Sequence, residues 1–375
     1  MKTSRRDIIK AGVLGAAAAS ASFPLIAAER ETSPGRPLDI LILGGTGFIG
    51  PHMVREALRR GHSVTLFNRG RTNIALFPDL ETIKGDRNNG LDGLRGRRWD
   101  AVIDNSGYVP RHVRDSAGLL APSVSHYLFV STVSVYASFK QDLDENSALA
   151  TIADESIEQV TGETYGALKA LCETAVRQVV GEERSTILRP TYICGPGDHT
   201  DRFTWWPVRT SSGGEMLWPG RPGDAIQIID VRDFANFTVD CIQKKIAGTY
   251  VTATPENGYT MGDLLRDCQA VTATKVDDTW VDEAFALSAS KDSPVKNHGA
   301  FPVWHPQRGP DAVTAQIISK AARGAGMHNR PVRETIRDLM RWWRTLPDDR
   351  TSTMQAGMPA EYEAELIARW KKNHA

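Results

Sequence analysis

Cysteine is scarce in this sequence of 375 residues, and its four cysteines show no pairing pattern. There is no C-x-x-C pair and no histidine at the spacing of a metal ligand, which argues against a zinc site and against a disulfide framework. We interpret the cysteines as buried or inert thiols and expect no metal. They are Cys172, Cys194, Cys241 and Cys268.

The sequence also lacks an excess of charge of either sign. Lysine plus arginine number 45, and aspartate plus glutamate also number 45, so nothing favours a nucleic acid or a membrane surface as partner. After the N-terminal segment, no stretch approaches the roughly 20 apolar residues that a membrane-spanning helix needs. We therefore expect no stable membrane insertion and a small molecule as the partner.

Residues 1–28 have the order of a cleavable export signal. Arg5 and Arg6 precede an apolar, alanine-rich run that ends at Ala28, and paired arginines at this place are typical of the twin-arginine type. Residues 29–37 are polar with two prolines and are interpreted as a linker. We expect export to the periplasm by the twin-arginine machinery, with any cofactor already tightly bound.

From residue 38 the pattern repeats strand, turn and helix. This order predicts an α/β fold, a doubly wound parallel sheet of the Rossmann type. We expect a dinucleotide-binding domain over residues 38–192 and a smaller substrate lobe over 193–375, with C-terminal helices and some segments returning to the sheet. The strands are predicted at residues 39–43, 62–67, 82–84, 101–104 and 127–130.

The expected substrate lobe begins with a change of composition. Residues 193–223 are rich in glycine, proline and tryptophan, which predicts a region made largely of loops. Residues 332–343 contain neither glycine nor proline and predict an amphipathic helix. A last helix is predicted over residues 359–372.

Three glycines at the end of the first strand indicate a phosphate site. Gly44, Gly47 and Gly50 stand between that strand and the first helix, which is predicted over residues 51–60. Glycine lets the backbone approach a pyrophosphate closely, and the helix N-terminus stabilises its negative charge. Strand, spacing and helix agree, and we interpret the motif as a dinucleotide site.

The phrase GGTGFIG at residues 44–50 resembles the extended branch of the short-chain dehydrogenase/reductase superfamily, the NAD-dependent epimerase/dehydratase type. Other motifs of that family follow in the same order, so the resemblance covers most of residues 38–250. They lie at residues 85–87, 105–107, 131–136, 165–169 and 189–197.

The resemblance implies a role for each motif in holding the cofactor. It implies an aspartate at the adenine amino group, a turn that packs over the cofactor after the fourth strand, and a segment along the nicotinamide after the sixth. The expected cofactor-binding residues are Gly44, Gly47, Phe48, Ile49, Gly50, Asn68, Arg69, Asp86, Arg87, Asn105, Ser106, Gly107, Lys169, Pro190, Tyr192 and Ile193.

The candidate catalytic residues are Tyr165, Lys169 and Thr132. A tyrosine four residues before a lysine on a helix puts both side chains on one face. A cation there and a positively charged nicotinamide ring are expected to lower the pKa of the phenol, so that it can take a proton from a hydroxyl group. Thr132, at the end of a strand, would hold the reacting oxygen. Ser131 and Ser134 are alternatives to Thr132, one of which only caps a turn.

The end of the second strand bears on the type of cofactor. A site selective for NAD usually has an acidic residue there, for the ribose 2′-hydroxyl. This sequence instead has Asn68 and Arg69, and an arginine would pair with a 2′-phosphate. We expect NAD(P), with a preference for NADP. The alternative is that Arg69 stacks on the adenine.

Two features depart from sugar-nucleotide epimerases. Ile226 stands where those enzymes carry an arginine for the substrate diphosphate, and the gap between Thr132 and Tyr165 predicts an inserted loop. The phrases LFNRGR and IKGDR, with the isoleucine, are more similar to the atypical branch that includes chloroplast stem-loop-binding proteins. A specific substrate therefore does not follow from the resemblance.

Aromatic and basic residues in the second half are candidates for holding a sugar ring, although any one tryptophan is as compatible with core packing. The substrate candidates are Ser134, Tyr192, Arg202, Trp205 and Arg221. The function that we predict is an epimerase or dehydratase acting on a carbohydrate or other hydroxyl-bearing small molecule, redox-neutral and retaining its cofactor. The alternatives are an NADP-dependent carbonyl reductase or dehydrogenase and a non-catalytic, dinucleotide-bound binding protein.

Overall fold

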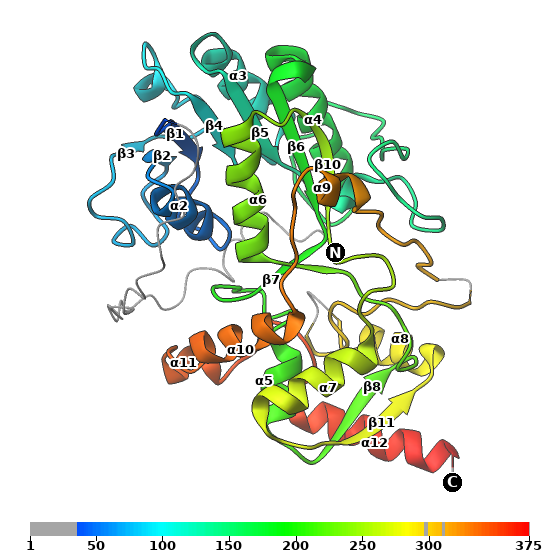
Figure 1. The fold of residues 1–375 in the computed structure, drawn as a ribbon. Coiled ribbons are helices and arrows are strands. Elements are labelled where there is room, and N and C mark those ends of the chain that lie inside the picture. Colours follow the sequence, from blue (N-terminus) through cyan, green and yellow to red (C-terminus); the bar gives the residue numbers. More distant parts are fainter. Residues whose placement is uncertain (1–35, 296–298, 310–311, 375) are drawn as a thin grey trace.

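The computed structural model describes residues 36–295, 299–309 and 312–374. The predicted signal at residues 1–28 and most of the predicted linker lie outside the described residues. Figure 1 shows two lobes, with a parallel sheet in the upper one and a smaller group of helices and short strands below.

The upper lobe contains a seven-stranded sheet in which every neighbouring pair is parallel. Its order is β10-β6-β5-β4-β1-β2-β3, so the direction of winding reverses between β1 and β4. This arrangement confirms the predicted doubly wound α/β fold. The strands are β1 (Asp39–Leu43), β2 (Ser63–Asn68), β3 (Thr82–Lys84), β4 (Ala101–Asp104), β5 (His126–Val130), β6 (Ser185–Pro190) and β10 (Gly248–Thr252).

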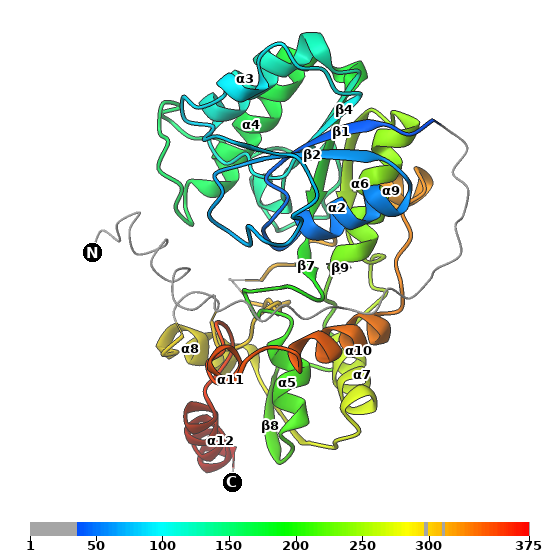
Figure 2. The same cartoon turned by 90° about the vertical axis from the view of Figure 1, so that its left-hand side faces the viewer.

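Helices cover both faces of the sheet, as Figure 2 shows for α3 and α4 on one side and α2 and α6 on the other. Alternation along β1 explains this, because Ile40 and Ile42 enter the core beneath α2 and α6 while Leu41 and Leu43 enter the opposite core. The helices are α2 (Gly50–Arg59), α3 (Pro110–Leu120), α4 (Tyr165–Val180) and α6 (Val231–Lys244).

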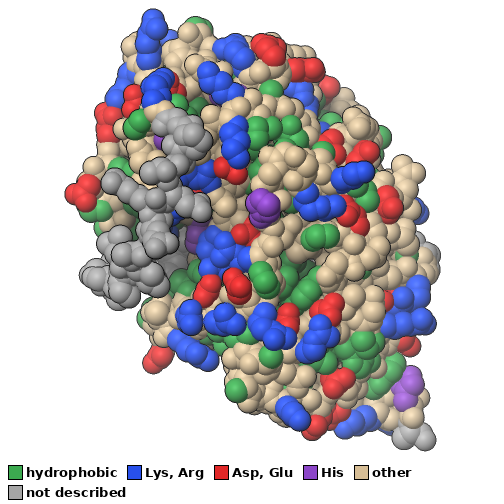
Figure 3. All heavy atoms as spheres, in the orientation of Figure 1, with side chains coloured by type: hydrophobic (Ala, Val, Ile, Leu, Met, Phe, Trp, Pro, Cys, Tyr) green, Lys and Arg blue, Asp and Glu red, His purple; other side chains and the backbone are tan. Residues whose placement is uncertain are grey.

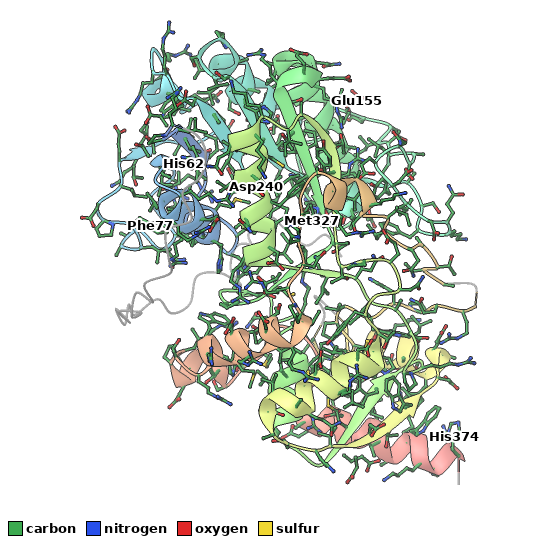
Figure 4. The ribbon with its side chains drawn as sticks, in the orientation of Figure 1. His62, Phe77, Glu155, Asp240, Met327 and His374 are labelled. Atoms are coloured by element: carbon green, nitrogen blue, oxygen red, sulfur yellow. The ribbon has the colours of Figure 1, made fainter. Side chains whose placement is uncertain are left out.

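Polar contacts tie α2 and α6 together at the edge of their shared core. The Arg60 guanidinium contacts Asp240 of α6 at 2.6 Å, and Figure 4 labels this aspartate on its helix. Met327, also labelled there, is buried in the same core after the short helix α9 (Lys320–Gly324). The C-terminal half of the chain thus returns to support the sheet.

The lower lobe has a core of its own, and residues 193–223, predicted to be largely loops, contribute a helix and a strand to it between loop segments. Within that range lie a helix and a strand whose side chains are mostly buried, including Trp206 and Trp218 at 0% exposure. Helix α10 has the predicted bounds. The elements are α5 (Trp205–Ser211), β8 (Glu215–Pro219), α7 (Met261–Thr272), β11 (Asp277–Val281), α8 (Glu283–Asp292), α10 (Val332–Trp343), α11 (Asp348–Thr351) and α12 (Ala360–His374).

A short parallel pair, β7 (Tyr192–Cys194) and β9 (Ile228–Asp230), lies between the two lobes in Figure 2. Strand β7 follows β6 almost directly, so the chain leaves the large sheet and enters the lower lobe within a few residues. Single 3₁₀ turns complete the structure, at η1 (Asp92–Leu94), η2 (Ala121–Ser123), η3 (Val133–Val135) and η4 (Glu182–Arg184).

Candidate functional site

The candidate site begins where β1 and β4 end side by side. The connections from these strands run in opposite directions, and such a reversal leaves a crevice at the carboxyl ends of a parallel sheet. Gly44, with φ +112°, lies against Asn105, and a Cβ on Gly44 would overlap the Asn105 amide oxygen. The Ser106 hydroxyl donates to the Leu43 carbonyl at 3.0 Å. The predicted residues after β1 and β4 are therefore in contact.

The glycine turn has the shape that a pyrophosphate needs. A Cβ on Gly50 would lie 2.6 Å from the backbone of Gly45, so α2 can pack this closely only with glycine there. Gly47 is exposed, and its Cβ position has no neighbouring atom within 4 Å among the described residues. Phe48 and Ile49 directly precede α2, which has no side-chain cap at its N-terminus, so its first amides lack a capping partner from that residue. These residues fit the phosphates of a dinucleotide.

A segment of the lower lobe packs against the same turn. Gly197 approaches Phe48, with its Cβ position 3.6 Å from the ring, and the His52 imidazole lies 2.8 Å from the Pro196 carbonyl. Burial lowers the pKa of His52 to about 4, so the ring is neutral at pH 7 and adds no charge beside the phosphate position.

The end of β2 holds the glycine turn in place. Asn68 donates to the Gly44 carbonyl at 3.3 Å and accepts from the Gly70 amide at 2.8 Å. Arg69 is exposed, and no hydrogen bond or ion pair is seen for it within the described part of the chain. Its guanidinium is thus available to a ligand phosphate or ring.

The two cofactor-binding residues predicted after β3, Asp86 and Arg87, have different surroundings. Asp86 is exposed, and its carboxylate accepts from the Asn88 amide at 2.9 Å. Arg87 turns inward and forms an ion pair with the buried Asp104. Its two terminal nitrogens donate to the two carboxylate oxygens at 2.5 and 2.8 Å, and this carboxylate also accepts from the Tyr127 hydroxyl. This corrects the expectation that the Arg87 side chain holds the cofactor, because its terminal nitrogens are committed to a buried carboxylate.

Lys169 is buried beneath the strand ends. Its ammonium donates to the carbonyls of Gly107 at 2.7 Å and Val130 at 2.6 Å, and it lies 4.0 Å from the centre of the Phe129 ring. Burial lowers the pKa of Lys169 to about 8. The amine thus joins the ends of β4 and β5 and stays charged at neutral pH.

Tyr165 begins α4 near Thr132, the residue that follows Ser131 after β5. Burial raises the pKa of Tyr165 to about 12, although the Thr132 hydroxyl and the charge of Arg202 lower it. Desolvation therefore outweighs the described charges around the phenol, and the lowering expected from a bound nicotinamide ring stays a prediction. Tyr165 is a neutral phenol at pH 7.

The three hydroxyl groups that follow β5 differ in burial and in hydrogen-bond partners. Ser131 is buried and donates to Glu173 at 2.6 Å, so it supports α4 and does not face the site. Thr132 accepts from the Ser134 amide at 3.1 Å and caps η3. Ser134 is exposed at the same cavity as Thr132. The Thr132 hydroxyl donates to the Ser134 hydroxyl at 3.2 Å, and of the three residues Thr132 is the one that influences the Tyr165 phenol.

A cavity of about 380 Å³ opens beside Thr132. Ile226 lines it, so the isoleucine expected to replace a diphosphate-binding arginine does face this space. Of the predicted residues, Pro190 and Tyr192 also line it, whereas Ile193 is buried in β7. The described lining consists of Thr132, Val133, Ser134, Phe139, Pro190, Thr191, Tyr192, Arg202, Ala225, Ile226, Gln227, Val303, His305, Gln307, Val313, Ala315, Gln316 and Ile317.

Several lining residues were not found from the sequence. His305 stacks on Tyr192, with ring centres 5.9 Å apart, and its Nε2 lies 2.9 Å from the tyrosine hydroxyl. Residues 313–317 reach the cavity because the loop between Thr132 and Tyr165 pairs with them, as in the bridge of Leu143 with Ile317. Such contacts join distant segments without a local motif, so the sequence carried no signal for them.

Two predicted substrate residues lie elsewhere. Trp205 is 2% exposed and packs edge-on against Trp206 in the core of the lower lobe, at 4.8 Å between ring centres. Arg221 is exposed and is absent from the described lining of the cavity. Both assignments are corrected: a stacking platform of tryptophans does not form, because the tryptophans fill a core that the sequence did not reveal.

Across the described residues, no cluster of His, Cys, Asp and Glu is suited to a metal ion. In the same residues, no helix combines the length and the apolar character needed to cross a bilayer. The face in Figure 3 mixes basic and acidic side chains. Within the described residues, the candidate site is therefore the crevice at the strand ends and the cavity beside Thr132.

Comparison with known proteins agrees with this geometry. Residues 40–121 match the model of the NAD dependent epimerase/dehydratase family. The chain is 26% identical over 246 residues to a chloroplast stem-loop binding protein of 41 kDa from Arabidopsis thaliana, and the match covers 61% of this chain and 62% of the relative. The likeness to that atypical branch, inferred from short phrases, thus extends well beyond them.

Two solved structures share the fold. The UDP-glucuronic acid 4-epimerase of Bacillus cereus, in complex with NAD, has a TM-score of 0.60 at 13% identity, covering 83% of this chain and 97% of its own. The Bordetella bronchiseptica enzyme WbmG, in complex with NAD and UDP, has a TM-score of 0.60 at 14% identity, covering 86% and 100%. These two structures show that the fold is shared, and the family model matches residues 40–121 of the sheet-containing lobe.

Proposed function

We propose that this protein is a dinucleotide-dependent epimerase or dehydratase that acts on a carbohydrate, or a similar hydroxyl-bearing molecule, and keeps its cofactor through each turnover. The observation that carries this proposal is the position of three side chains: Tyr165 begins α4 near Thr132, which follows β5, and Lys169 of the same helix is bonded to carbonyls that follow β4 and end β5. When bound, the nicotinamide supplies reversible hydride transfer.

Thr132 and Tyr165 have separate roles in substrate binding and proton transfer. Thr132 lies near the Tyr165 hydroxyl and lines the cavity, so both are in reach of one substrate oxygen. The neutral phenol can donate a proton to a carbonyl oxygen, and it takes a proton from a hydroxyl once its pKa is lowered by positive charge. Arg202 supplies one such charge.

The size and lining of the cavity support a small substrate. A volume of about 380 Å³ lies at the lower end of the usual range for ligand pockets, about 300–1,000 Å³. Ile226 offers no hydrogen bond to a diphosphate. We therefore propose a free or glycosidic sugar in preference to a sugar nucleotide.

For the cofactor we propose a preference for NADP over NAD. Arg69 supports it, because this exposed guanidinium follows β2, where the ribose of the adenosine is bound in such folds. An Arg69→Ala variant should bind NADPH at least tenfold more weakly and bind NADH almost unchanged, measured by quenching of protein fluorescence. Equal losses for both cofactors would contradict the preference and favour stacking on adenine.

The catalytic proposal is tested by Tyr165→Phe. We expect native protein to reduce its bound cofactor transiently, seen as absorbance of the reduced nicotinamide, when it meets its substrate in a panel of sugars. The variant should lose this signal by a factor of about 10²–10⁴, the usual contribution of a general acid–base, and keep its unfolding midpoint. Full retention of the signal would instead favour a dinucleotide-bound binding protein, and steady net oxidation of NADPH would favour the reductase.

A further inference from the structure

One charged side chain, Arg202, stands in the described lining of the cavity beside Thr132. No aspartate or glutamate occurs in that lining, although the buried Asp198 lies behind it and interacts electrostatically with Arg202. A guanidinium keeps its positive charge in proteins. The surroundings otherwise combine apolar side chains, such as Phe139 and Val303, with neutral polar ones. A partly enclosed cationic cavity favours a substrate that carries a negative charge.

Within the described residues Arg202 has no carboxylate partner, unlike several other arginines of its lobe. Within the described residues, Arg209 pairs with Glu363, Arg308 with Asp224 and Arg350 with Asp201, whereas no ion pair to Arg202 occurs there. The single hydrogen bond seen for its guanidinium runs from Nε to the Thr200 hydroxyl, at 3.0 Å. Its two terminal nitrogens therefore remain free for a ligand.

The guanidinium is nevertheless held in position. Its central carbon lies 4.9 Å from the centre of the Tyr192 ring. The Thr200 hydroxyl that accepts from it donates in turn to Asp198, at 2.6 Å, and Asp198 is completely buried. A planar group fixed by stacking and by a hydrogen bond on one edge presents its other edge to the cavity with little loss of entropy on binding.

The other polar lining groups are largely used by the protein itself. Gln227 donates to the carbonyls of Thr254 and Ile317 and accepts from the Ile317 amide at 2.6 Å. The Tyr192 hydroxyl is engaged with His305. Arg202 is thus the charged group of the cavity whose hydrogen-bonding capacity is left for a substrate.

We propose that the cavity recognises a carboxylate through the free edge of Arg202, so that the substrate is a hydroxy acid of monosaccharide size, a uronic acid being the model. This inference rests on the proposed function for the identity of the reacting hydroxyl. A carboxylate fits because two parallel hydrogen bonds from an arginine match its two oxygens. Thr132 and Arg202 line the same cavity, so one small molecule can span the reacting oxygen and its anchoring acid.

The test measures binding separately from turnover. Full-length native protein with its retained cofactor is titrated calorimetrically with D-glucuronate, D-glucose and D-glucose 6-phosphate. We expect glucuronate to bind roughly tenfold to hundredfold more tightly than glucose, the usual effect of a charge-assisted pair. Arg202→Gln should abolish this difference, and Arg202→Lys should keep part of it. Arg221→Gln is the matched control, an exposed arginine outside the described lining, and should bind as the native protein does.

Each other outcome overturns the inference. Equal binding of glucuronate and glucose, no binding of glucuronate, or an Arg202→Gln variant that folds normally and still prefers glucuronate would exclude the carboxylate site. Tighter binding of glucose 6-phosphate than of glucuronate would show that the site recognises a phosphate group and not a carboxylate.

Failure of the proposed function looks different. If glucuronate binds through Arg202 but no substrate ever changes the absorbance of the bound cofactor, the anion site stands and the catalytic proposal fails. If neutral sugars reduce the cofactor in the native protein and in Arg202→Gln alike, catalysis stands and the carboxylate inference fails.

Discussion

Lys169 shows how a single buried charge organises the crevice. An ammonium removed from water is costly unless it is paired or hydrogen-bonded. Here two backbone carbonyls and the face of Phe129 compensate it, and the same bonds fix the turn at Gly107. The lysine therefore shapes the site as well as charging it.

The lowered pKa of Lys169 can be measured directly. Because burial disfavours the charged form, the amine should lose its proton as pH rises through about 8, and not near its usual value. The sign for stability follows: the buried charge costs free energy of folding below about pH 8, and this cost disappears as pH rises towards the pKa of the unfolded chain. NMR titration of labelled lysine side chains should show one low midpoint that is missing in Lys169→Met. A normal midpoint for every lysine would contradict this.

Alanine substitutions of Gly50 and Gly47 separate the effect of the glycine turn on stability from its effect on dinucleotide affinity. Gly50→Ala forces a Cβ to within 2.6 Å of the Gly45 backbone, so it should lower the free energy of unfolding by about 1–3 kcal/mol and weaken dinucleotide binding. Gly47→Ala meets no described atom within 4 Å, so stability should change by about 0.5 kcal/mol or less while dinucleotide affinity still falls. Unchanged affinity in Gly47→Ala would argue against close approach of the phosphates at this turn.

Between elements, the decisive contact joins the start of α4 to η3. A Cβ on Gly166 would overlap the carbonyl oxygen of Ser134, so glycine at this position allows α4 to bring Tyr165 against Thr132. The alignment of phenol and hydroxyl thus depends on a neighbour of the tyrosine that does no chemistry. Below it, the buried pair of Glu173 and Arg189, at 2.7 Å, joins α4 to β6.

We predict that Gly166→Ala separates α4 from η3. Activity should fall by one to two orders of magnitude, because a misplacement near 1 Å is enough to misalign the reacting groups, and the unfolding free energy should drop by about 1–3 kcal/mol. Gly118→Ala is the control: this exposed glycine of α3 meets only Val179, at 3.9 Å, and its replacement should add about 0.5–1 kcal/mol of stability. Chemical denaturation and turnover are measured on both. Normal turnover in Gly166→Ala would show that the contact is not needed.

On the scale of the whole molecule, the crevice is bordered by both lobes. The sheet contributes the glycine turn, and the lower lobe contributes residues near Gly197 that pack on Phe48. A dinucleotide bound here would be released slowly if release requires these segments to part. Slow release is what we propose for an exported enzyme, because the twin-arginine route delivers folded protein and no external dinucleotide pool replaces a lost cofactor.

The export proposal has its own test. Changing Arg5 and Arg6 to lysine should keep the protein in the cytoplasm, while the native chain should reach the periplasm with its cofactor bound. Cell fractionation gives the location, and native mass spectrometry of each fraction gives the occupancy. Arg36→Lys, beyond the predicted signal, should be exported normally. Recovery of native protein from the periplasm with an empty site would count against a retained cofactor.

The sequence alone determined the sheet, the glycine turn and the placing of Tyr165 and Lys169 on one helix, because these depend on local periodicity and short spacings. Tertiary structure alone decided the cavity, the inward turn of Arg87, the burial of Trp205 and the raised pKa of Tyr165. Those properties depend on which distant segments pack together and how much water they exclude, and no local pattern records either quantity.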